Sequence, residues 1–147
     1  TKTTKAMTSK ELVRQTLEKW HFPILQETDN GLTIRYQMSY LSIGPLSEDN
    51  TCIAVSMSGL FKVENDKEMH LALKACNELN FRMMQVKLNI DNDDDLVIGV
   101  EFFYRTEEDV EYLLNLVLQS VVTTKKKFEA VVEEDKLLQE LNGDSLD

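Results

Sequence analysis

Apolar residues recur at helical spacing between Thr106 and Phe128. A helix turns by about 100° per residue, so residues three or four apart share one face. The main stripe consists of Val110, Leu114, Val117, Val121 and Phe128. Four further apolar residues widen it, namely Leu113, Leu116, Leu118 and Val122. The polar side carries Tyr112, Asn115, Gln119 and Thr123. This apolar arc is wider than one sheet face needs, so we expect part of it to contact another chain or a bound partner.

Both ends of this helix can be judged from the same pattern. Thr106, with Asp109 three residues later, predicts a cap, because their oxygens can accept hydrogen bonds from free backbone N–H groups. At the other end the helix either continues through Val132 or breaks in the charged patch Lys125–Lys127. The strongly acidic sequence after Glu133 predicts fraying or disorder.

The chain begins with a short amphipathic helix from Ser9 to Trp20, capped by Thr8 or Ser9. A hairpin follows, in which strand Ile24–Glu27 is joined to strand Leu32–Met38 through Asp29-Asn30-Gly31. The Asn-Gly pair predicts positive φ angles in this tight turn.

The next segments predict a third strand and a second helix. Ser39–Asn50 contains glycine, proline and polar residues that favour a loop, although its apolar residues can also extend the preceding strand. Cys52–Val63 predicts a long strand with a bulge at Gly59. Asn65 and Glu68 predict the capped start of a helix ending near Asn80. Its expected core stripe is Met69, Ala72, Leu73, Cys76 and Leu79.

A second hairpin is predicted from Met83–Ile90 and Leu96–Tyr104, where apolar and polar residues alternate. The apolar positions of its first strand are Met84, Val86, Leu88 and Ile90. The predicted order is therefore α-β-β-β-α-β-β-α. Antiparallel strands with one polar face need helices on one side only, so we expect a two-layer α+β sandwich.

Length and composition indicate one domain, residues 9–132. Residues 1–8 are expected to be disordered or to come from an expression vector, and residues 133–147 to form an acidic, flexible tail. The net charge of −10 argues against nucleic acid and anionic membranes as partners. No apolar run approaches the ~20 residues that span a bilayer. Without a secretory signal in Thr1–Ser9, we expect a cytoplasmic protein.

Candidate chemistry is sparse. Asp91–Asp95 imitates the first half of a calcium loop, but Leu96 stands at the glycine position and Phe102 at that of the bidentate glutamate. We interpret it as a solvated hairpin tip, where weak cation binding is the alternative. Cys52 and Cys76 are expected to be reduced, buried thiols. No metal site or cofactor is predicted.

Catalysis is not indicated either. His21 and His70 lie in no known nucleophile pattern, although triads assembled in space do not show in sequence. The five glycines are scattered singly, so no phosphate loop is present. We therefore expect a protein that is not an enzyme. The methionines are interpreted mainly as core filler, with an adaptable binding surface as the alternative.

The passage Cys76–Phe81, followed by Val86–Ile90, the acidic turn and Leu96–Phe103, resembles the YbjN family of bacterial proteins. The family's asparagine-x-x-asparagine pair at the end of the central helix is matched by Asn77 and Asn80. The resemblance implies a sensory transduction regulator with a fold similar to that of type III secretion chaperones. We expect the two amides to act locally at the helix end. A polar ligand contact is the alternative.

The leading hypothesis is a non-catalytic protein-binding module, chaperone-like or regulatory, that forms a homodimer. It would recognise a partner segment in a helix groove or along a sheet edge. The candidate contact residues are Leu113, Leu116, Leu118 and Val122. The rival hypothesis is a small-ligand sensor with a pocket near Trp20, Tyr36 and Phe102.

Overall fold

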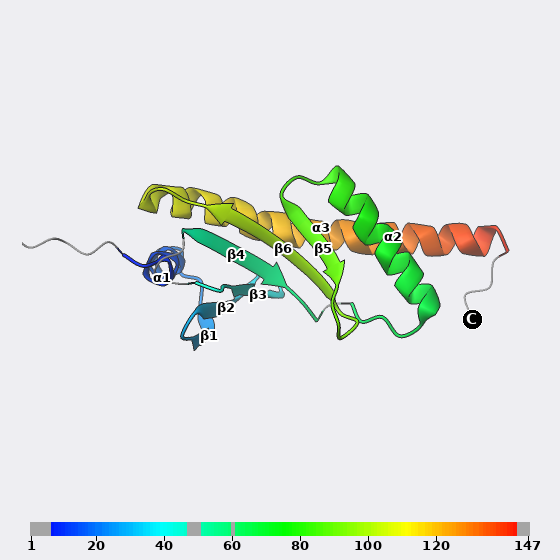
Figure 1. Ribbon diagram of the computed structural model, residues 1–147, viewed down its shortest axis with the longest axis horizontal. Helices are drawn as coiled ribbons and strands as arrows, with labels where there is room; N and C mark the ends of the chain where they lie inside the picture. Colours follow the sequence, from blue (N-terminus) through cyan, green and yellow to red (C-terminus); the bar gives the residue numbers. More distant parts are fainter. Residues whose placement is uncertain (1–6, 47–50, 60, 144–147) are drawn as a thin grey trace, which may run out of the picture. The chain divides into compact units, whose positions relative to one another are not determined.

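The computed structural model describes residues 7–46, 51–59 and 61–143, which form the α+β arrangement with an antiparallel sheet that the sequence predicts (Figure 1). Along the chain the elements are α1 (Ser9–Lys19), β1 (Ile24–Thr28), β2 (Gly31–Tyr36), β3 (Ser39–Ile43), β4 (Cys52–Met57), α2 (Asp66–Arg82), β5 (Val86–Ile90), β6 (Leu96–Phe103) and α3 (Glu107–Leu141). Hydrogen bonding orders the strands β1-β2-β3-β4-β6-β5. The observed order therefore contains one strand more than predicted.

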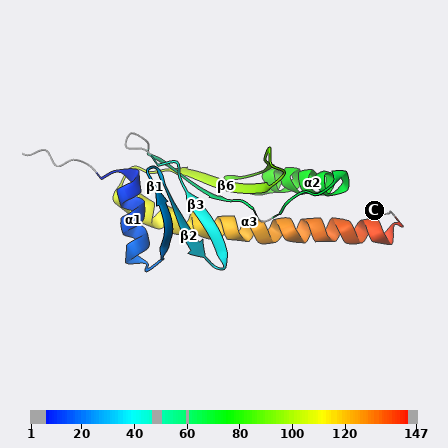
Figure 2. The same ribbon diagram turned by 90° about the horizontal axis from the view of Figure 1, so that it is seen from below.

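The chain divides into two compact units. The first comprises α1, β1 to β3, most of β4, the end of β6 and α3 as far as Gln119. The second comprises α2, β5, most of β6 and α3 from Ser120 onward. In Figure 2 the first unit shows α1 beside the hairpin strands β1 and β2. In the second, α2 packs against β5.

The additional strand is β3, which the sequence left between a loop and a strand extension. It pairs antiparallel with β2, and Tyr36 lies opposite Ser39. The two turn residues, Gln37 and Met38, both have positive φ, 46° and 68°. This is the backbone geometry of a type I′ turn, whose twist suits a two-residue hairpin. Neither residue is a usual turn former, which explains why the sequence did not reveal the hairpin.

The first hairpin differs from the prediction in its turn. Thr28 lies opposite Gly31, so Asp29 and Asn30 form the connection. Positive φ is found at neither Asn30 nor Gly31. The predicted role of the Asn-Gly pair is therefore wrong, although the hairpin itself is confirmed.

Helix α1 ends in a Schellman motif. The N–H of Phe22 donates to the carbonyl of Leu17 (2.9 Å), and the N–H of His21 donates to that of Glu18 (3.0 Å). This pattern requires a left-handed residue, and His21 supplies it with φ 60°. Pro23 then prevents further helix. Trp20 and Phe22 are consequently held on either side of a fixed chain reversal.

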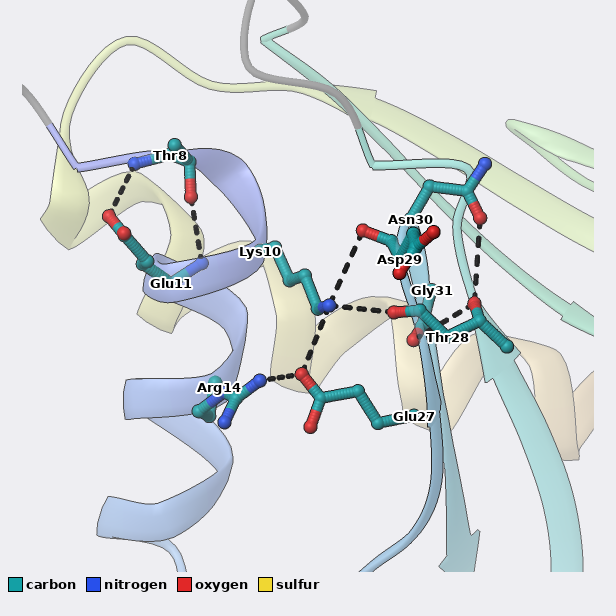
Figure 3. A network of polar contacts seen from close by, with 9 residues as sticks. All are labelled: Thr8, Lys10, Glu11, Arg14, Glu27, Thr28, Asp29, Asn30 and Gly31. Atoms are coloured by element: carbon teal, nitrogen blue, oxygen red, sulfur yellow. Dashed lines mark hydrogen bonds and ion pairs between the residues drawn. The ribbon is translucent and has the colours of Figure 1, made fainter.

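A charged network fastens α1 to the first hairpin (Figure 3). The Lys10 ammonium group lies 3.0 Å from the Glu27 carboxylate and donates to the carbonyl of Thr28 at 2.6 Å. Arg14 pairs with the same Glu27 carboxylate. Thr8 caps the helix, since its hydroxyl accepts from the N–H of Glu11 at 3.2 Å. Lys10 also donates to the carbonyl of Asp29 at 3.3 Å. Two cationic side chains of α1 thus make four contacts with the first hairpin.

In the second unit the predicted cap of α2 is confirmed: Asn65 accepts a hydrogen bond from the N–H of Glu68 at 2.9 Å. The expected core stripe is wrong at Leu73, which is exposed, whereas Leu71 and Ala75 are buried. Met84 is also exposed and precedes the strand, which begins at Val86. Gln85, with φ 61°, changes the chain direction between Met84 and the strand.

Strand β4 is shorter than predicted. It ends at Met57, and Gly59 has a positive φ of 74° that interrupts the extended ladder where a bulge was expected. Beyond Gly59, an isolated antiparallel bridge joins Lys62 to Asp95.

Helix α3 starts with the predicted cap, because the N–H of Asp109 donates to the Thr106 hydroxyl at 3.2 Å. It continues through Lys125–Lys127 without a break and on to Leu141. The segment from Glu133 to Leu141, for which fraying was predicted, is therefore helical. Phe128 is fully buried and packs edge-on against Phe61, with ring centroids 5.2 Å apart.

The left-handed conformation of His21 at the end of α1 can be tested by substitution. A residue with a Cβ atom in the left-handed region is strained, so His21→Gly should raise the free energy of unfolding by about 0.5–1 kcal/mol. His70→Gly is the matched control. It replaces the other histidine, which is exposed within α2, and should lower that free energy by about 1 kcal/mol. Urea unfolding followed by circular dichroism measures both. Two changes of the same sign would contradict the assignment.

Candidate functional site

The acidic turn is an internally hydrogen-bonded hairpin tip. One Asp91 carboxylate oxygen accepts from the N–H groups of Asp93 (2.9 Å) and Asp95 (3.0 Å). Asp94 adopts a left-handed φ of 61°, which closes the loop. The Asp91 carboxylate is therefore engaged in hydrogen bonds that hold the turn. No three His, Cys, Asp or Glu side chains of the described residues are grouped as ligands for a metal ion.

Asn80 binds the backbone of the outer strand β5. Its amide nitrogen donates to the carbonyl of Leu88 and its amide oxygen accepts from the N–H of Leu88, both at 2.8 Å. A neighbouring strand would satisfy the same two groups, so Asn80 closes this sheet edge at one point. We predicted that the Asn80 amide acts locally at the end of the helix. It instead contacts Leu88, eight residues later in the chain. Asn77 is exposed on the same helix.

These contacts predict the effect of removing the amide. Asn80→Ala leaves the part-buried N–H and C=O of Leu88 unpaired, which should lower the free energy of unfolding by about 1–3 kcal/mol. Asn77→Ala removes an exposed amide from the same helix and should change it by less than about 0.5 kcal/mol. Chemical denaturation of both variants checks the comparison. Equal changes in the free energy of unfolding would show that the hydrogen bonds between Asn80 and Leu88 contribute no measurable stability.

The two cysteines are free, as the sequence predicts. Burial raises the pKa of the Cys76 thiol to about 11, because the low-dielectric core disfavours the thiolate. The pKa of Cys52 is raised by its burial and, to a smaller extent, by the Glu101 carboxylate. Cys76 is buried and Cys52 only half-buried. Neither environment is the electropositive one that activates a nucleophilic thiol.

Thiol labelling should separate the two residues. At a pH of about 8, a water-soluble disulfide reagent should modify Cys52 in the folded protein, while Cys76 reacts only on unfolding. Cys52→Ala and Cys76→Ala assign the two kinetic phases. Fast labelling of the Cys52→Ala variant without denaturant would contradict the burial of Cys76.

An open groove in the first unit brings exposed aromatic groups together. It has a volume of about 360 Å³ and is lined by Trp20, Phe22, Glu111, Tyr112, Asn115 and Leu116. Tyr112 is 69% exposed and Leu116 is 46% exposed. The Phe22 ring lies edge-on to Trp20 (5.9 Å between centroids) and to Tyr36 (5.6 Å). The aromatic wall is therefore fixed from behind by the core.

A second hollow adjoins the first and shares Glu111 with it. Its volume is about 510 Å³, and its lining residues are Leu12, Gln15, Thr16, Glu18, Lys19, Glu107, Glu108 and Glu111. Lys19 on α1 pairs with Glu111 on α3 at 2.7 Å. We call the two hollows together the α1–α3 groove. Its first end is aromatic and its second end is acidic.

The four candidate contact residues of α3 differ in how far they are buried. Leu118 and Val122 are buried inside the protomer, so they have no surface to offer a partner. Leu113 is half-buried, and Leu116 lines the α1–α3 groove. The width of the apolar arc thus reflects internal packing for half of the set. The prediction of a partner surface stays for Leu116 and Leu113.

Two of the three residues proposed for a small-ligand pocket lie in the core. Tyr36 and Phe102 are buried, and the Tyr36 ring faces Phe22. Desolvation raises the pKa of the Tyr36 hydroxyl. Trp20 lines a groove that is open to solvent.

The sequence did not single out Tyr112, Phe22 or Glu111 as groove residues. Tyr112 was assigned to the polar side of its helix, and its ring is an exposed part of the wall. Phe22 carried a usable signal, because an apolar residue between a helix end and a proline fits the Schellman position. Glu111 carried none, since its neighbour Lys19 lies 92 positions away.

No protein-family model and no curated protein matches the chain. Its fold is similar to that of solved structures. YbjN, described as a candidate transcription regulator from E. coli, shares 16% identity over 92% of this chain and 97% of its own, with a TM-score of 0.57. An uncharacterized protein from Methanothermobacter thermautotrophicus shares 12% identity over 86% of this chain and 98% of its own, with a TM-score of 0.60. The chain has a YbjN-like fold.

Proposed function

We propose that this chain is a non-catalytic protein-binding module, chaperone-like or regulatory, and that it holds a partner segment in the α1–α3 groove. The observation that carries the proposal is the preformed aromatic wall. The Schellman motif fixes the backbone that carries Trp20 and Phe22, and the exposed side chains of Tyr112 and Leu116 line the same groove. Aromatic side chains in a rigid hollow are frequent anchors of protein–protein contacts, because little side-chain entropy is lost on binding.

Recognition in this groove is favoured over strand addition at a sheet edge. At β5, Asn80 already occupies the backbone groups of Leu88. At β1, the pairing register shifts between Ile24 and Gln26. Such an irregularity twists an edge strand and weakens it as a template for another strand. Both features disfavour pairing with an extended partner.

YbjN is described as a candidate transcription regulator, and that description concerns YbjN itself. The shared fold is compatible with a regulatory role of this chain. We place the module in the bacterial cytoplasm as a homodimer, as the family resemblance implies. Two free cysteines are compatible with a reducing compartment. None of the described helices is long and apolar enough to span a bilayer.

A pair of matched variants tests the groove. Tyr112→Ala combined with Leu116→Ala removes two anchors and should weaken partner capture about tenfold or more, as expected for two contact residues worth more than about 1 kcal/mol each. Tyr40→Ala combined with Leu25→Ala removes the same residue types at exposed positions of the same unit (62% and 51% exposed). It should leave capture unchanged.

Quantitative mass spectrometry of affinity captures from the native lysate provides the measurement, and light scattering reports the oligomeric state of each variant. Thermal unfolding shows whether both variants are folded. Partner capture that is equal in the two double variants would rule out the α1–α3 groove as the binding site.

A further inference from the structure

The α1–α3 groove has a chemical polarity along its length. Along α3 its lining residues are Glu107, Glu108, Glu111, Tyr112, Asn115 and Leu116. They share one broad helix face. Glu107, Glu111 and Asn115 are four residues apart from one another in turn, and so are Glu108, Tyr112 and Leu116. At 1.5 Å per residue this face is about 13 Å long, which corresponds to about four residues of extended chain. Acids occupy the half nearest the start of α3, and apolar groups occupy the other half.

The acidic half has an excess of negative charge. Glu18, Glu107, Glu108 and Glu111 line it, against the single cation Lys19. Lys19 pairs with Glu111, and no ion pair among the described residues engages Glu18, Glu107 or Glu108. Glu107 and Glu108 also stabilise the positive end of the α3 dipole. Glu18 has no such role, because it lies near the end of α1, where a negative charge is unfavourable.

We propose that the occupant of the α1–α3 groove is a short basic segment of a partner protein, with an apolar anchor followed by Arg or Lys residues. This inference rests on the proposed function and specifies its partner. The anchor packs against Trp20, Phe22 and Leu116. The cationic groups lie along Glu107, Glu108 and Glu18, and the first of them contacts the exposed Tyr112 ring, whose face attracts a cation.

Charge complementarity selects this occupant over a second copy of the chain. The chain carries a net charge of −10, so a second copy in the groove would add negative charge beside its carboxylates, whereas a basic segment adds the opposite charge. The same repulsion excludes acidic peptides. Residues 1–6 of the chain contain two cations, Lys2 and Lys5, and the experiment tests them as competitors of the peptide.

The probe is an acetylated and amidated peptide with two leucines followed by three arginines. Its control carries three glutamates in place of the arginines. Trp20 is the only tryptophan of the chain and lies in the groove, so its fluorescence reports occupancy directly. We expect a saturable change with the basic peptide that weakens as salt rises, and no change with the acidic one. A response to both peptides, or to neither, would overturn the proposed partner chemistry.

Charge variants locate the effect. Glu107→Gln combined with Glu108→Gln should weaken peptide binding about 3- to 10-fold, the range for the loss of two surface charge pairs. Glu133→Gln combined with Glu134→Gln removes the same charge from exposed positions of α3 in the second unit, and should change binding by less than about twofold. Equal weakening in both variants would show attraction by net charge alone and contradict the proposal.

Two further outcomes separate the competing explanations. A chain that starts at Met7 should bind the peptide with the same affinity as the full chain. Binding about tenfold tighter or more would mean that residues 1–6 occupy the groove and would overturn the proposed occupant. Loss of the natural partner in Tyr112→Ala/Leu116→Ala, together with full capture in Glu107→Gln/Glu108→Gln, would overturn the basic segment while leaving the binding module intact.

Discussion

Continuous burial along α3 is the constraint on which the rest of the structure depends. Val110 and Leu114 contribute to the core of the first unit, and Val121, Phe128 and Val132 to that of the second. A single helix must therefore keep one apolar stripe in register over many turns, which requires helical geometry without a break at Lys125–Lys127. Burial of these side chains is also what makes the helix stable at this length, because helical propensity alone contributes little.

The remaining faces of the helices are free to serve a partner. In the first unit, α3 uses Leu114 and Leu118 for packing, which leaves Tyr112 and Leu116 on the outside. Helix α1 presents Trp20 to the same side because the left-handed residue His21 stops the helix directly after it. The groove is therefore formed by two helix ends and by side chains that are not buried in the core.

Polar groups in this protein are used chiefly to close ends and edges. Asn80 satisfies the outer backbone groups of Leu88 on β5, and Asp91 accepts from two N–H groups of the turn between β5 and β6. Lys10 does the same for the end of β1. Each of these groups has partners within its own unit. The carboxylates of the α1–α3 groove differ from them. Glu18, Glu107 and Glu108 are exposed, and no ion pair within the described part of the chain engages them. This difference supports a cationic partner.

The sequence by itself determined the features that depend on near neighbours. The caps at Asn65 and Thr106 and the alternation along β6 were predicted correctly, because each involves residues within one turn or one strand. Only the tertiary structure decided which apolar residues of α3 are buried, that Asn80 reaches Leu88, and that Glu111 meets Lys19. Burial and pairing across distant segments depend on where the chain returns in space, and periodicity shows which face of an element is apolar without showing how much of that face is covered.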